Sequence, residues 1–497
     1  MSANFLKCRR KRTVRKSQPM SYISYDMAPS SPPTDLPPKH VRAARALLAW
    51  SQQDLAKAAK VATSTVADFE RGSRTPVANN AQAIRNALEA EGIRFLPTGA
   101  VIGPAVPIMA PSGRPGMPVR WVDVDDLAAW AGRTDGPVSL PTLLAFLIRA
   151  THGHAAPLRF PSDGGVRHPG WDGLTTSEKA SDYVPAGEAG WELSAQRIGV
   201  AQKIAKDYKK RTDNPAPLDP ATSTCIFVTL HHWPQKDEWA KAQITAGPWK
   251  DVRVYDADDL VHWIEQTPAV GLWLATRLDK RPKGTRELDE VWEEWSLATQ
   301  WPLTADLVLS DRDQDAAEVM RWLRGEPSVL SLQATTSEEV VAFFHAAIGE
   351  LPDDLAQAYR ARCLVATSAA AARALADAPA PLILVLTEPD PGLARKLAAR
   401  GHFVLQAYDE APTPRGEVRV LERPSREGIA NALEDAGIAE PRAKALARDS
   451  ARNLAVLRRL LPGAPGRLPK WAQEVPPHAL LAALMAGGWD DQAEADK

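Results

Sequence analysis

Hydrophobic and polar positions divide this chain into stretches of different periodicity. Over residues 38–97, apolar residues recur at helical spacing, as Leu55, Ala58 and Val61 do, and predict four or five short helices. From residue 119 onwards, short β-forming runs alternate with helical patterns. The pattern therefore predicts a multidomain α/β protein that begins with an all-α domain.

Segments rich in proline and glycine separate these stretches. We expect the following organisation: a disordered basic leader at 1–37, a helical domain at 38–97, a linker at 98–118, an α/β domain at 119–280, a parallel α/β domain at 300–422 and a helical lid or tail at 423–497. A chain of 497 residues is too long for one core, which agrees with several domains.

Composition narrows the function classes only slightly. The net charge of −1 gives no global basic field, so any nucleic-acid site must be a local patch. The cysteines Cys8, Cys225 and Cys363 are far apart, which fits a reducing compartment and excludes CxxC zinc spacing. No stretch approaches the length of a membrane span. We therefore expect a cytoplasmic protein without a membrane partner.

The first domain carries the clearest motif. Ser51 followed by Asp54 predicts a capped helix start, and the pattern over Thr63–Glu70 predicts a second short helix. The pattern RxLLxWSQxxLAxxAxVxxSTVxxFExGxRTP resembles the Cro/C1-type (XRE-family) helix-turn-helix. This resemblance implies binding to double-stranded DNA with Thr63–Arg71 as the recognition helix. Where many relatives have glycine in the turn, this chain has Lys60, which implies left-handed backbone strain.

The expected DNA contacts are small polar groups on the recognition helix and phosphate donors around it. They are Gln52, Gln53, Lys57, Lys60, Thr63, Ser64, Thr65, Ala67, Arg71 and Arg74. The charge of Asp68 disfavours phosphate. Since a single module of this size binds weakly, we expect a homodimer or a larger assembly. The alternative is a helical module for protein interaction or dimerisation.

The middle domain predicts the element order α-β-β-β-α-β, then β-α. This order resembles the restriction-endonuclease-like PD-(D/E)xK fold, notably its Mrr-like branch. The resemblance implies that Asp172 and Glu192 are catalytic and hold Mg²⁺, with Ser194 at the position of the lysine. Lys203 from the next helix, and Gln196, are candidates to replace that lysine. One alternative is that Asp172 only forms a turn and Glu192 faces solvent. A second alternative is that the fold is nuclease-like but the domain is an inactive recognition module.

The third domain predicts a parallel sheet and a helical lid, and looks like an AAA+/STAND P-loop domain. Its segment LQATTSEE lacks the glycines and the lysine that would hold phosphates, and Glu338 and Glu339 would repel a triphosphate. We therefore expect a degenerate scaffold domain without a nucleotide cofactor.

These regions together predict three functions. The first is a DNA-binding protein whose nuclease-like domain is an Mg²⁺-dependent endonuclease in prokaryotic antiphage defence. The second is a non-enzymatic DNA-binding transcriptional regulator or sensor with an inactive nuclease-like domain. The third is a scaffold for protein assembly. The first two differ at Asp172, Glu192 and Lys203.

Overall fold

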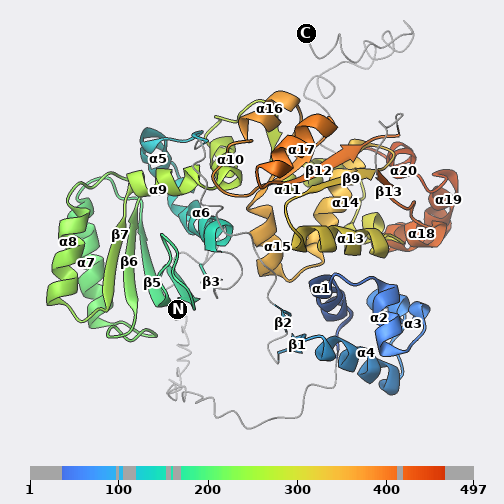
Figure 1. Cartoon of the computed structure of the whole chain (residues 1–497), viewed down its shortest axis with the longest axis horizontal. Coiled ribbons are helices and arrows are strands. Elements are labelled where there is room, and N and C mark those ends of the chain that lie inside the picture. Colours follow the sequence, from blue (N-terminus) through green and yellow to red (C-terminus); the bar gives the residue numbers. More distant parts are fainter. Residues whose placement is uncertain are drawn as a thin grey trace, which may run out of the picture.

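The computed structural model describes residues 36–96, 100–104, 119–152, 158–160, 170–410 and 418–464. Nearly all of the expected leader, most of the expected linker and the tail after residue 464 lie outside these residues. The described chain forms a helical region, a middle region with a five-stranded sheet and a third region with a six-stranded sheet (Figure 1). None of the described helices combines the length and the apolar character that a membrane crossing requires.

The helical region contains four helices and a short hairpin. Its elements are α1 (Pro38–Leu48), α2 (Gln52–Ala59), α3 (Thr63–Glu70), α4 (Ala78–Ala90), β1 (Arg94–Phe95) and β2 (Val101–Ile102). Leu55, Val66 and Ile84 are fully buried and join α2, α3 and α4 in one core. The hairpin corrects the expected start of the linker at residue 98. Val101 pairs with Phe95 and is buried, because two apolar residues interrupt the proline- and glycine-rich segment and pack against α1.

The middle region is a mixed sheet between two layers of helices. Its elements are α5 (Val124–Ala131), α6 (Asp135–His152), β3 (Leu158–Arg159), β4 (Gly173–Ser177), β5 (Gly187–Ser194), α7 (Val200–Asp213), β6 (Thr224–Thr229), α8 (Lys236–Ala246), β7 (Asp251–Tyr255), α9 (Ala257–Glu265) and α10 (Pro268–Arg277). The strand order is β3-β4-β5-β6-β7. The pairs β3–β4 and β4–β5 are antiparallel, whereas β5–β6 and β6–β7 are parallel. The elements thus follow the order that the sequence predicted, with α5, α8 and α10 as additions.

The two faces of this sheet bury different tryptophans. Trp191 and Trp263 lie in the core that α6 and α9 cover, and Trp171 and Trp249 lie in the core on the side of α7. Gly190 of β5 leaves room for the Trp171 ring, because a Cβ atom at this position would lie 2.5 Å from that ring. Trp171 is thereby held directly over β5, beside Glu192.

The third region is a mainly parallel sheet with helices around it. Its elements are β8 (Thr285–Arg286), α11 (Leu288–Ser296), α12 (Ala305–Leu309), α13 (Asp313–Arg324), β9 (Val329–Gln333), α14 (Ser337–Gly349), α15 (Asp353–Arg360), β10 (Cys363–Ala366), α16 (Ala369–Ala374), β11 (Ile383–Leu386), α17 (Pro391–Ala399), β12 (Phe403–Tyr408), β13 (Arg419–Val420), α18 (Arg426–Asp435), α19 (Glu440–Asp449) and α20 (Leu454–Leu460). The strand order is β13-β9-β12-β11-β10-β8, and only β8 runs antiparallel to its neighbour.

The expected start of this region at residue 300 is too late. Thr285 of β8 pairs with Ala366 of β10, so the sheet begins before that residue. Val291 and Trp295 of α11 are buried in the core that α14 also enters. The strand signal was weak because β8 is only two residues long and lies at the edge of the sheet.

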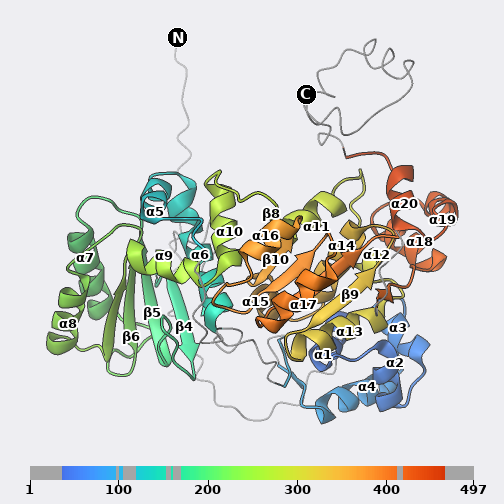
Figure 2. The same ribbon diagram turned by 45° about the horizontal axis from the view of Figure 1, so that its top comes forward.

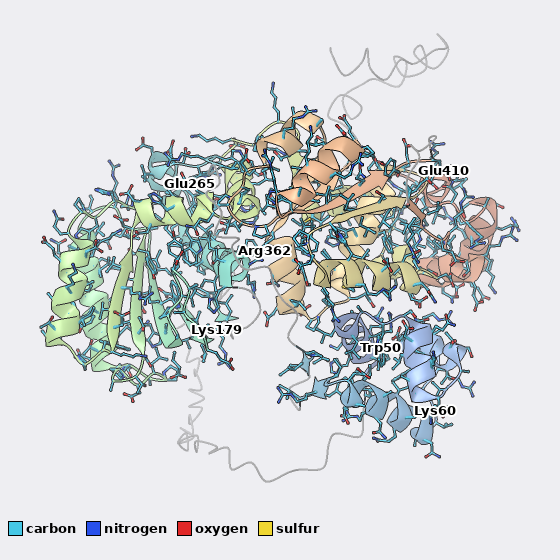
Figure 3. The ribbon with its side chains drawn as sticks, viewed as in Figure 1. Trp50, Lys60, Lys179, Glu265, Arg362 and Glu410 are labelled. Carbon is cyan, nitrogen blue, oxygen red and sulfur yellow. The ribbon has the colours of Figure 1, made fainter. Side chains whose placement is uncertain are left out.

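The three regions pack against one another. Leu272 of α10 and Leu364 of β10 share one core between the middle and third regions, and Arg362 donates a hydrogen bond to the carbonyl of Ala150 at 2.7 Å. Arg362 lies at this junction in Figure 3. The helical region docks through α1 onto α13, and its core is continuous with that of the third region. Figures 1 and 2 both place the helical region beside α13.

Candidate nucleic-acid interface and the middle-region carboxylates

Local sequence determines how α2 leads into α3. The Ser51 hydroxyl accepts a hydrogen bond from the Asp54 N–H at 3.1 Å, and the Asp54 carboxylate accepts one from the Ser51 N–H at 2.8 Å. This is the capping box that the sequence predicted. Lys60 follows the last residue of α2 and caps the helix. Its φ of 55° is left-handed, as expected from its place in the turn. A lysine in this conformation carries strain that glycine would not.

The first turn of α3 presents small polar side chains to solvent. Thr63 and Ser64 are exposed, and Thr65 and Ala67 are partly exposed, whereas Val66 turns into the core. The expected base-contacting face therefore lies on the surface. Its side chains are short, so the helix backbone can approach a groove closely.

Basic side chains surround this face. Lys57, Lys60, Arg71 and Arg74 are all exposed. Arg71 forms an ion pair with Asp68 at 2.7 Å, so part of its charge is already neutralised within α3. Lys60 lies at the end of α2 that is remote from α13, whereas Trp50 lies near the docked end (Figure 3). Lys60 therefore lies away from the docked interface, whereas Arg71 lines the cleft beside that interface.

A buried ion pair that the sequence analysis missed supports α1 and α3. Glu70 is only 3% exposed, and Arg45 donates to both of its carboxylate oxygens, at 2.9 and 3.1 Å. The side-chain amide of Gln52 donates to the same carboxylate at 2.9 Å. The Gln52 side chain is therefore partly buried and turned towards Glu70. The signal in the sequence was a charged residue at an inward position on each of two amphipathic helices.

The α2 N-terminus meets the third region. The Gln52 N–H donates to the carboxylate of Asp313 at 2.9 Å, and the Gln53 side chain accepts from Gln314 at 2.9 Å. A cleft of about 550 Å³ lies beside these contacts. Arg42, Arg45, Gln52 and Arg71 line it from the helical region.

The carboxylates of the middle region lie together on the side of the sheet that α7 covers. Asp172 directly precedes β4 and accepts a hydrogen bond from the Leu193 N–H of β5 at 2.9 Å. Glu192 is 5% exposed and forms an ion pair with Arg211 of α7. Arg211 also donates to the Gly170 carbonyl and lies over the Trp171 ring, 4.9 Å from its centroid. This corrects the alternative of a solvent-facing Glu192.

The pKa values of both acids reflect this crowding. Burial raises the pKa of Asp172 above its ordinary value, against the hydrogen bond from Leu193 and the charge of Arg211. Burial raises the pKa of Glu192 to about 7, and the Asp172 carboxylate contributes to the increase, while Arg211 opposes it. The charges of the two carboxylates therefore interact, and Arg211 is shared between them.

The residues expected to replace the lysine turn elsewhere. Lys203 forms an ion pair with Asp207 one turn along α7. The Gln196 side chain donates to the Ile198 carbonyl at 2.6 Å, and the Ser194 hydroxyl accepts from the Gln196 N–H at 3.2 Å. The positive charge of Lys203 still acts on Asp172 and opposes the increase in its pKa that burial causes. Arg211, which the sequence analysis did not select, makes the direct contact.

Within the described residues, the side chains with metal-ligand spacing lie at a different place. His232, Asp256 and Asp258 bring one ligand atom each within 4.8 Å of one another. Asp256, however, caps α9 and accepts hydrogen bonds from the Trp233 N–H at 2.9 Å and from Lys236 at 2.7 Å. Its oxygens are therefore already used by the protein.

The β9–α14 connection of the third region is an ordinary capped helix start. The Thr336 hydroxyl accepts from the Glu339 N–H at 3.2 Å. Glu339 is buried and pairs with Arg312 at 2.5 Å, so its charge turns inward, whereas Glu338 is exposed. Of the two acids expected to repel a triphosphate, only Glu338 has its charge on the surface.

Comparison with known protein families finds a match for the helical region. A family model described as helix-turn-helix matches residues 41–92, which span most of α1, all of α2, α3 and α4, and the turn that follows. No curated protein and no solved structure matched the chain. The XRE-family helix-turn-helix predicted from the sequence is therefore confirmed for this region, and it supports a DNA-binding function.

Proposed function

We propose that this protein is a non-enzymatic DNA-binding regulator that reads duplex DNA with α3. The observation that carries the proposal is the exposed face of Thr63 and Ser64 inside the matched helix-turn-helix. Lys57, Lys60 and Arg74 would contact phosphates beside it, which supplies affinity, while the α3 side chains supply specificity.

The direct test is a binding titration with the full chain. The probe is a fluorescent pool of random duplexes of about 40 base pairs at about 50 mM salt, where binding to phosphates is strong. Ser64→Glu should weaken binding about tenfold or more, because a carboxylate would face the DNA. The new acid stands in the first turn of α3, where it favours the helix, so the fold is retained.

The matched control is Ala90→Glu. Ala90 is an exposed residue in the last turn of α4, and the substitution adds the same charge away from the α3 face. This variant should bind within about twofold of the wild type, as expected for a remote exposed charge. Equal weakening by both variants, or no weakening by Ser64→Glu, would contradict the proposed interface.

The middle region is proposed to be an inactive nuclease-like module. The element order and the places of Asp172 before β4 and Glu192 on β5 agree with the PD-(D/E)xK resemblance. The pairing of Arg211 with Glu192 supports the inactive alternative, because a guanidinium takes the carboxylate that a cation would need. The third region is proposed to be a scaffold, because its segment LQATTSEE lacks the glycines and the lysine that would hold phosphates.

An Mg²⁺-dependent endonuclease is the second candidate. The observation in its favour is the convergence of Asp172 and Glu192, whose charges interact within one buried site. Incubation of supercoiled plasmid with the full chain, with Mg²⁺ or with a chelator, tests it. Cleavage that requires Mg²⁺ and that Glu192→Gln abolishes would establish the endonuclease. Intact plasmid in all reactions would leave the non-enzymatic function.

A further inference from the structure

The phosphate-binding end of α2 is occupied by the protein itself. The free N–H groups at a helix N-terminus attract anions, and in a helix-turn-helix they face the DNA backbone. Here the Gln52 N–H is bound to the Asp313 carboxylate at 2.9 Å. Asp313 lies 261 residues further along the chain, in the first turn of α13. A carboxylate of the third region thus takes the place that a phosphate oxygen would take.

Further acids of the third region face the basic side chains of the helical region. Arg42 pairs with Asp306 at 2.5 Å and approaches Glu350 at 3.8 Å, and Arg45 approaches Glu350 at 3.9 Å. Asp311 lines the cleft together with Arg71. Burial acts to raise the pKa of Asp311, but hydrogen bonds with Ser425 and Ser310 lower it overall, and the charge of Arg71 adds to that lowering. We call Asp306, Asp311, Asp313 and Glu350 the acidic face.

Further hydrogen bonds and apolar packing hold the helical region against α13. The Gln53 side chain accepts a hydrogen bond from Gln314, and Arg321 donates to the Ala49 carbonyl at 3.4 Å. α1 packs on α13 within a continuous apolar core. Asp313 is therefore held at the α2 N-terminus by a packed interface and not by a single hydrogen bond.

We propose that this arrangement is a masked form, in which the acidic face substitutes for DNA phosphates and competes with duplex DNA for the helix-turn-helix. The inference rests on the proposed DNA-binding function. Two physical effects make the competition direct. One N–H cannot serve both Asp313 and a phosphate, and the acidic face would repel a DNA backbone that approached the α2 N-terminus. DNA binding at full strength therefore requires the helical region to leave α13.

Masking lowers the apparent affinity for DNA in proportion to the small fraction of unmasked chains. The release variant Asp306→Asn with Asp313→Asn keeps the side-chain shapes and removes two charges from the acidic face. In the duplex titration we expect it to bind about tenfold more tightly than the wild type.

Removal of any acid raises attraction to DNA, so a charge-matched control is required. Glu326 and Glu388 are exposed residues of the third region outside the cleft lining. Glu326→Gln with Glu388→Gln should change the affinity by no more than about twofold, the size of a remote electrostatic effect. An equal gain in both double variants, or no gain in the release variant, would overturn the masking.

A reversible crosslink tests the movement itself. Gln53→Cys and Gln314→Cys place two thiols at the contact, in a chain that also carries Cys8→Ser, while Cys225 and Cys363 are buried. Because Gln53 is itself an expected DNA contact, the reference is the same double-cysteine chain before crosslinking. A short bis-thiosulfonate reagent should lock the masked form and reduce duplex binding at least tenfold relative to that reference, and reductant should return binding to the reference value. Excess duplex should slow the crosslinking. Undiminished binding by the locked chain would overturn the proposal.

The experiments separate the two proposals. If wild type and release variant both bind duplex, and Ser64→Glu weakens both, the DNA-binding function stands whatever the crosslink does. If none of the chains binds duplex, including the release variant and the reduced double-cysteine chain, the function fails and the masking fails with it.

Discussion

Two of the places where the sequence predicts a ligand are occupied by side chains of the chain itself, whereas the α3 face is open. At the α2 N-terminus, the carboxylate of Asp313 stands where a phosphate is expected. In the middle region, the guanidinium of Arg211 contacts the carboxylate where a cation is expected. Each substitute has the charge of the ligand that it replaces.

The origin of the two substitutes differs, and so does their reversibility. Asp313 comes from a separate region across an interface, so it can leave if the helical region moves. Arg211 is 4% exposed, belongs to the same domain as Glu192 and is packed against Trp171. It can leave only if the middle region opens. The comparison indicates a controllable site in the first case and a structural ion pair in the second.

The largest expected effect is the loss of the Arg211 charge. Arg211→Met retains much of the side-chain length but leaves Glu192 and Asp172 buried together without a cation. We expect a loss of stability of about 3–5 kcal/mol, as is typical when one partner of a buried pair is removed. Thermal unfolding followed by circular dichroism measures it.

The neighbouring exposed Lys210 of α7 supplies the control for this substitution. Lys210→Ala should change the stability by less than about 0.5 kcal/mol. If Mg²⁺ restored the melting temperature of Arg211→Met, Asp172 and Glu192 would form a metal site that Arg211 blocks. The Arg211–Glu192 contact would then not be a purely structural ion pair.

The second prediction concerns pH. The pKa of Glu192 is raised from 4.5 to about 7 in the folded state. Its contribution to stability is therefore full below the unfolded pKa and is lost as pH rises through about 7. From about pH 5.5 to about pH 8.5, the wild type should lose roughly 2 kcal/mol relative to Glu192→Gln. Parallel melting profiles of the two proteins over this range would contradict the shared buried site.

The third prediction contrasts the effects of Asp313 on folding and on binding. Asp313→Asn removes the anion at the α2 N-terminus and a favourable charge in the first turn of α13. Both effects are small, so we expect a loss of at most about 1 kcal/mol of stability, although the variant should bind DNA more tightly. A stability loss as large as that of Arg211→Met would mean that the Asp313 contact is a structural one, like the Arg211–Glu192 pair.

The smallest expected effect tests the helix-turn-helix alone. Lys60→Gly relieves the left-handed conformation at φ 55°, at the cost of a more flexible unfolded chain. We expect a net gain of about 0.5 kcal/mol in thermal unfolding. Lys60→Ala keeps the strain and should give no gain, so equal gains would exclude the backbone explanation. Lys60 is remote from the Asp313 and Arg211 contacts. Its gain in stability should therefore add to the stability changes caused by substitutions at those two residues.

Local pattern explains why so much of the fold could be predicted. The capping box at Ser51 and Asp54, the left-handed turn at Lys60 and the strand around Glu192 depend on residues close in the sequence. The sequence signals were weak where an element is short or where its partner is distant. The hairpin strand Val101–Ile102 and the edge strand Thr285–Arg286 are each two residues long, and the predicted domain boundaries left both outside their domains.

The sequence by itself determined the helix-turn-helix and the two acids that merit attention in the middle region, because periodicity and motif spacing encode them locally. Only the tertiary structure decided what those groups contact. Arg211 reaches Glu192 from 19 residues away, and Asp313 reaches Gln52 from 261 residues away. The position of a charged residue in the sequence does not indicate which residue it will pair with. Folding selects the partner, because a buried or helix-terminal charge is stable only beside an opposite one.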